Sequence, residues 1–101
     1  MIIVQYTKQD DKYLHLEVSG HAEYAKHGED LVCAGVSSIM FGLINMLDEL
    51  NENIDIKKTK DAIIINNLTD SIKVQDYIEL VMMQLKTIEK TQSNYLKIER
   101  K

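Results

Sequence analysis

The 101-residue chain contains no proline, no tryptophan and only one cysteine. A lone cysteine cannot form an internal disulfide, so nothing in the sequence indicates an oxidising compartment. There is also no excess of positive charge, because the net charge at pH 7 is −4, which gives no support for binding nucleic-acid phosphates. The first residues lack the basic segment of a secretory signal peptide. We therefore expect a cytoplasmic protein that does not bind nucleic acid directly.

Apolar residues make up 45% of the chain and charged residues 28%, which is typical of a soluble globular protein. A chain of this length is expected to form a single domain over residues 1–101. Its longest apolar stretch, Val36 to Leu50, is interrupted by polar residues and is shorter than the roughly 20 residues that cross a bilayer. No membrane association is therefore expected.

Alternating apolar residues predict strands at Ile2–Thr7 and Tyr13–Ser19, joined in a hairpin by the polar segment Lys8–Asp11. The residues of the second strand that we expect to face the core are Leu14, Leu16 and Val18. Short β-branched segments predict three further strands, at Ile54–Ile56, Ala62–Ile65 and Tyr95–Ile98.

Apolar residues at spacings of three and four predict helices from Asp30 to Leu50 and from Ser71 to about Lys90. Thr69 or Asp70 is expected to cap the second helix. The order ββαββαβ predicts an α+β two-layer sandwich, a mainly antiparallel sheet with two helices on one face. The first helix is apolar beyond a single stripe, so we expect it to meet a partner chain or a ligand groove as well as the sheet.

The single cysteine, Cys33, is expected where the long helix begins. With Asp30 as the N-cap, Cys33 would be the third residue of the first turn. The positive end of the helix dipole favours a thiolate there, and amides without intrahelical acceptors could stabilise an oxyanion. A lone cysteine near a helix start is more often a small buried hydrophobic residue, so that alternative stays open.

Two histidines precede Cys33 and could act as its general base. His21 lies at the end of the second predicted strand, where its small neighbours Gly20 and Ala22 leave room for a substrate. His27 lies inside the loop that follows, where it would be held less rigidly. His21 is therefore the better base for a Cys–His pair.

A metal site is the other chemistry that these side chains could support. His21, His27 and Cys33 are spaced six residues apart, and no tight pair at metal-motif spacing is present. We therefore expect no metal and no other cofactor.

Two separated motifs resemble the ribosomal-processing cysteine protease family of Firmicutes and related bacteria. They are Gly20-His21-Ala22 and Gly28-Glu29-Asp30-Leu31-Val32-Cys33-Ala34-Gly35-Val36-Ser37. The resemblance implies a cytoplasmic, homodimeric endopeptidase that uses His21 and Cys33 as its dyad. It also implies that the loop between them closes over the substrate, the N-terminal extension of a large-subunit ribosomal protein precursor. The residues expected to orient or bind this substrate are Gly20, Asp30, Ala34, Ser37 and Phe41.

On the Cys33 face of the first helix, Ser37, Met40, Phe41 and Ile44 recur at helical spacing. Some of them could line a groove for the aromatic substrate side chains that the resemblance implies, and core packing is the alternative for Met40, Phe41 and Ile44. The second functional hypothesis is a non-catalytic dimeric binding module associated with ribosome assembly. It predicts a buried and unreactive Cys33.

Overall fold

A computed structural model describes the backbone of residues 1–20 and 29–101. Five strands and two helices follow one another in the order ββαββαβ. They are β1 (Ile2–Gln9), β2 (Lys12–Ser19), α1 (Glu29–Leu50), β3 (Asp55–Lys58), β4 (Ala62–Asn66), α2 (Ile72–Thr91) and β5 (Leu96–Arg100). This order confirms the one predicted from the sequence, with most element bounds shifted by one or two residues.

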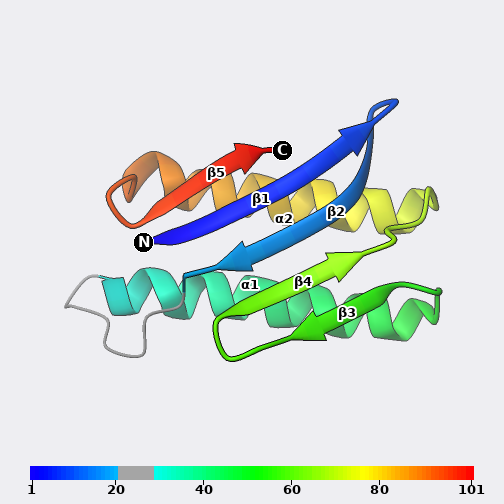
Figure 1. The fold of residues 1–101 in the computed structure, drawn as a ribbon, viewed down its shortest axis with the longest axis horizontal. Helices are drawn as coiled ribbons and strands as arrows, with labels where there is room; N and C mark the ends of the chain where they lie inside the picture. Colours follow the sequence, from blue (N-terminus) through cyan, green and yellow to red (C-terminus); the bar gives the residue numbers. More distant parts are fainter. Residues whose placement is uncertain (21–28) are drawn as a thin grey trace.

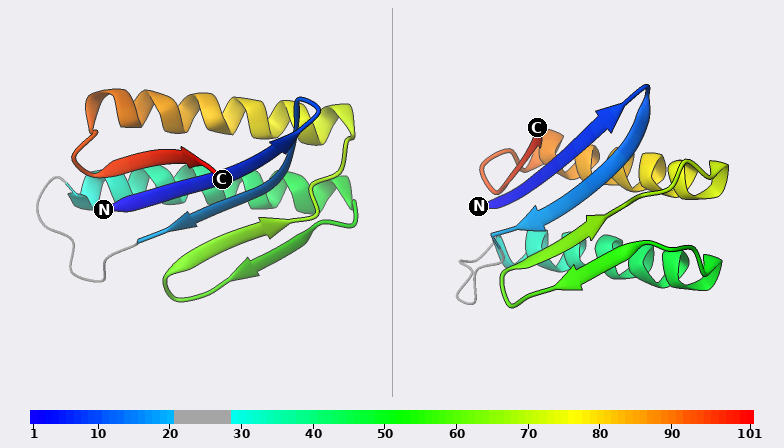
Figure 2. Two further views of the ribbon diagram at one scale, coloured as in Figure 1. Left: turned by 45° about the horizontal axis from the view of Figure 1, so that its top comes forward. Right: turned by 45° about the vertical axis from the view of Figure 1, so that its right-hand side comes forward.

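The five strands form one sheet in the order β3-β4-β2-β1-β5, and both helices lie side by side on one of its faces (Figures 1 and 2). Every neighbouring pair is antiparallel except β1 and β5, which are parallel. The parallel pair arises because α2 carries the chain from β4 across the sheet to its far edge. The predicted α+β two-layer sandwich is confirmed.

The hairpin between β1 and β2 turns at Asp10 and Asp11, whose φ angles of 51° and 65° are typical of a type I′ turn. Beyond the turn the register shifts, because Lys8 pairs with Tyr13 and Thr7 pairs with His15. Leu14 is therefore the extra residue of a β-bulge. The expectation that Leu14 faces the core is wrong: Leu14 is 40% exposed and Tyr13 only 3%.

The core lies between the sheet and the helices. The buried residues of α1 recur at spacings of three and four and are Val32, Val36, Met40, Leu43 and Leu47. At the start of α2, the side chain of Ser71 accepts a hydrogen bond from the amide of Val74 over 3.2 Å. Ser71 is thus the N-cap, in place of the predicted Thr69 or Asp70, because the helix begins one residue later than expected.

Among the described residues, one segment, Leu31–Leu50, is long and apolar enough to cross a membrane by length and composition alone. Its mean hydropathy is 1.7, and it starts five residues before the Val36 to Leu50 stretch that the sequence analysis judged too short to cross a bilayer. The helix that contains it packs one face against the sheet, and the core helices of soluble proteins can have the same composition. The apolar character of α1 is therefore weak evidence for a membrane.

Candidate active site

The chain leaves the sheet at Gly20, in a conformation that only glycine tolerates well. Its φ is +89°, and a Cβ atom added there would lie 2.2 Å from the backbone oxygen of Met1. The amide of Gly20 donates a hydrogen bond to the carbonyl of Asp61 over 3.2 Å. Gly20 therefore fixes the point from which the chain continues to His21, beside the turn between β3 and β4.

Helix α1 begins at Glu29, so Asp30 is its second residue and not its N-cap, contrary to the sequence prediction. Cys33 accordingly stands at the fifth helical position. The amides that lack intrahelical acceptors belong to the residues before it, including Glu29, Asp30 and Leu31. Side chains on a helix tilt toward its N-terminus, so the thiol of Cys33 still leans toward this positive end.

Cys33 forms no disulfide and is partly buried against the hydrophobic core. It is neither the fully buried residue of the non-catalytic hypothesis nor a surface cysteine. Ala34, which the sequence placed among the substrate-orienting residues, is exposed beside it. Cys33 therefore lies at the boundary between the buried and the exposed faces of α1.

A cavity of about 250 Å³ opens on the face of α1 that Cys33 shares. Ser37 and Phe41 follow Cys33 at intervals of one helical turn, and both line it. The remaining lining comes from the end of β3, the turn and the start of β4: Lys58, Thr59, Lys60, Ala62 and Ile63. Two of the residues proposed from the sequence to line a groove are thus brought together with side chains distant in sequence.

The other groove candidates pack differently. Met40 is fully buried in the core, and Ile44 is partly buried against it, so core packing is correct for these two residues. Phe41 is 45% exposed, and the Nζ atom of Lys58 lies 5.1 Å from the centre of its ring. This is a cation–π distance. Lys58 was missed by sequence reasoning, and its only signal was the short basic run Lys57-Lys58-Thr59-Lys60.

The turn that carries Lys58 and Lys60 toward α1 is held by Thr59. The hydroxyl oxygen of Thr59 accepts hydrogen bonds from the amides of Asp61 and Ala62, at 3.3 and 3.0 Å. The amide of Thr59 donates to the carbonyl of Ala62 over 2.8 Å. Together with the bond from Gly20, these contacts fix the turn, which lines the cavity together with Ser37 and Phe41 of α1.

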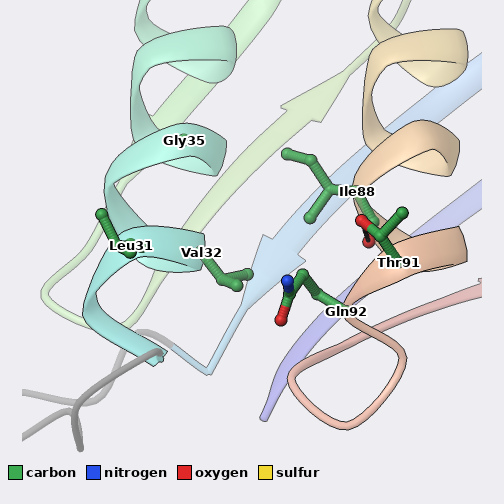
Figure 3. A pocket seen from close by; sticks show the side chains of 6 residues that line it. All are labelled: Leu31, Val32, Gly35, Ile88, Thr91 and Gln92. Atoms are coloured by element: carbon green, nitrogen blue, oxygen red, sulfur yellow. Dashed lines mark hydrogen bonds between the residues drawn. The ribbon is translucent and has the colours of Figure 1, made fainter.

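A second cavity, of about 270 Å³, lies on the opposite flank of α1. Val32 of α1 and Ile88 and Gln92 of α2 point toward one another across it (Figure 3). Gly35, another lining residue, is about 200° around the helix from Cys33. The described residues that line this cavity include no thiol and no titratable side chain, and the cavity lies away from the face of Cys33, so we assign the chemistry to the first cavity.

His21 and His27 lie outside the described residues, as does the loop predicted to close over substrate. The pairing of His21 with Cys33 therefore stays a prediction. Within residues 1–20 and 31–101, no group of three or more His, Cys, Asp or Glu side chains could hold a metal ion.

Comparison with known proteins adds to this geometry. Residues 1–97 match the family model described as cysteine protease Prp. The chain is 31% identical to the ribosomal processing cysteine protease Prp of Mycoplasma pneumoniae over 84 residues, 83% of this chain and 84% of that protein. It is 48% identical to the Bacillus subtilis protein of the same name over 46 residues, 45% of this chain and 41% of that one.

Among solved structures, the fold is similar to that of an essential ribosomal processing protease Prp from Staphylococcus aureus in complex with a substrate peptide. The TM-score is 0.91 at 28% sequence identity, and the match covers 100% of both chains.

Proposed function

The chain belongs to the Prp family of cysteine proteases, and on that premise we propose that Cys33 is its nucleophile and His21 its general base. The observation that carries this assignment is the position of Cys33. It is a cysteine without a disulfide in the first turns of α1, on the face that continues into the cavity lined by Ser37 and Phe41. A nucleophile so placed can reach a peptide that lies along the helix face.

In the proposed reaction, the proton of the Cys33 thiol passes to His21 and the thiolate attacks the carbonyl carbon of the scissile peptide bond. A C–S bond forms, and the carbonyl oxygen becomes an oxyanion. His21 returns the proton to the amide nitrogen as the C–N bond breaks, which releases an amine and leaves a thioester. Water then adds to the thioester, releases the carboxylate product and regenerates the thiol.

The start of α1 supplies the electrostatic stabilisation in this proposal. The first amides of the helix point toward its N-terminal end, where a negative charge is favoured. Asp30 belongs to the first turn of α1. We propose that Asp30 orients His21, the role that the family resemblance leaves open for it.

The proposed substrate is a large-subunit ribosomal protein precursor, from which the enzyme removes an N-terminal extension. The support is that the relatives from Mycoplasma pneumoniae and Bacillus subtilis are named ribosomal processing cysteine proteases.

We further propose that the enzyme is located in the cytoplasm, where ribosomes assemble, and that it is a homodimer, as the family resemblance implies. Gly20, Asp30, Ala34, Ser37 and Phe41 are the proposed orienting and substrate-binding residues.

The test is to incubate the purified protein with the ribosomal precursor encoded by the same organism and to follow its N-terminus by mass spectrometry. We expect a shortened product with the native enzyme and none with Cys33→Ala. Cleavage by the C33A variant would refute the nucleophile assignment. His21→Ala should abolish cleavage and His27→Ala should not, and the reverse result would exchange the two histidines.

A further inference from the structure

We infer that Lys58 is a specificity-determining residue, which makes the cavity beside Phe41 a subsite that accepts apolar and acidic substrate side chains and rejects lysine and arginine. The inference rests on the proposed protease function, because it concerns the peptide bound along the Cys33 face of α1. The observations behind it are the direction of Lys58 on β3, its contact with Phe41 and the charge of the cavity lining.

Lys58 projects from the sheet toward the helices. Its register partner on β4 is Ile63, which is buried, so both side chains stand on the inner face of the sheet. The neighbouring Lys57 pairs with Ile64 and faces the opposite side. Two adjacent lysines of one edge strand thus have different surroundings, and only Lys58 reaches the cavity.

The contact with Phe41 holds the ammonium group of Lys58 at the cavity wall. Its Nζ atom lies 5.1 Å from the ring centre, and Lys60 lines the same cavity. Among the described residues, no carboxylate lies within ion-pairing distance of Lys58. A second cation that entered would meet like charge beside an apolar ring, whereas a carboxylate would be attracted and an apolar group would pack on Phe41.

The position of the cavity assigns the substrate residue. Phe41 follows Cys33 by eight residues, which is about 12 Å along a helix. An extended peptide advances about 3.3 Å per residue, so the side chain opposite Phe41 belongs to a residue about three or four positions from the scissile bond. The cavity of about 250 Å³ is smaller than typical small-molecule sites, which suits one amino acid side chain.

The experiment is a set of peptides that span the cleavage site of the ribosomal precursor. Each position from two to four residues on either side of the scissile bond is replaced in turn by leucine, glutamate or lysine, and kcat and KM are measured for each peptide. At one of these positions we expect the native enzyme to cleave the glutamate and leucine peptides at least about tenfold more efficiently than the lysine peptide, mainly through KM.

Lys58→Met keeps the length of the side chain and removes its charge, so this preference should fall to within about twofold. Lys58→Glu should reverse it, a result that simple structural damage cannot produce. Lys57→Met makes the same charge change on the other face of β3 and should keep the native preference.

The inference is overturned if K58M retains the native preference, or if the native enzyme cleaves lysine peptides equally well at every position. Failure of the native enzyme to cleave any peptide would instead refute the proposed function. Circular dichroism of each variant shows that it is folded before its rates are compared.

Discussion

The amide of Gly20, at the end of β2, donates a hydrogen bond to the carbonyl of Asp61 in the turn between β3 and β4. This bond joins two segments that are separated by the whole of α1 in the sequence. It sets the exit toward His21 beside the turn that lines the cavity with Lys58 and Lys60. The end of β2 and the substrate subsite proposed here therefore lie at one corner of the sheet.

Gly20→Ala should destabilise the protein and slow cleavage. The positive φ of +89° costs a non-glycine residue about 1–3 kcal/mol, and the new Cβ atom would also collide with the backbone of Met1. Urea denaturation gives the change in the free energy of unfolding. The matched control is Gly42→Ala within α1, where a Cβ meets nothing within 4 Å and should add about 0.5–1 kcal/mol of stability. Equal stability of G20A and the native protein would contradict the assignment.

The thiol of Cys33 should react with iodoacetamide at neutral pH faster than an exposed control thiol, although Cys33 is partly buried. The reason is that the positive end of α1 favours the thiolate. The control is the double variant Cys33→Ala, Ala34→Cys, which moves the thiol to the adjacent exposed position. Mass spectrometry measures both alkylation rates. A native rate below that of the control would support the non-catalytic hypothesis, in which Cys33 is inert.

Gln75→Leu should destabilise the fold by about 2–3 kcal/mol. The Oε1 atom of Gln75 accepts from the amide of Tyr13 over 2.8 Å, and its Nε2 atom donates to the carbonyls of Tyr13 and Thr69, both over 2.9 Å. Leucine would leave these groups beside the bulge without partners. Gln84→Leu, at an exposed position of the same helix, is the control in urea denaturation and should change stability far less.

Stability should fall between about pH 10 and pH 12 because of Tyr13. Burial, with a further contribution from the carboxylate of Glu79, raises the pKa of Tyr13 from 10.0 to about 12. The unfolded phenol ionises at lower pH than the folded one, so the stabilisation is complete below pH 10 and is lost as the pH rises toward 12. The loss amounts to about 2–3 kcal/mol for two pKa units. Urea denaturation across this range should show a smaller loss for Tyr13→Phe, and an identical loss would refute the assignment.

The departures from the sequence predictions have separate physical causes. Tyr13, and not Leu14 as predicted, faces the core, because the bulge adds one residue to β2. The alternation of apolar and polar residues along a strand does not indicate where a bulge occurs. Ser71 replaced Thr69 and Asp70 as the cap of α2 because three neighbouring residues could all supply a capping oxygen. Asp30 is the second residue of α1 and not its cap, because helix α1 begins one residue earlier than the apolar periodicity indicates.

The sequence by itself determined the order of the elements and the grouping of Cys33, Ser37 and Phe41 on one face of α1. These features depend on the local backbone, because helical and strand periodicities set the direction of each side chain within its own element. Only the tertiary structure decided that Lys58 completes the cavity, since the hairpin of β3 and β4 reaches α1 through strand pairing and the bond between Gly20 and Asp61. Such contacts join residues far apart in the chain, and their free energy depends on the packing of the whole sheet, which no local pattern contains.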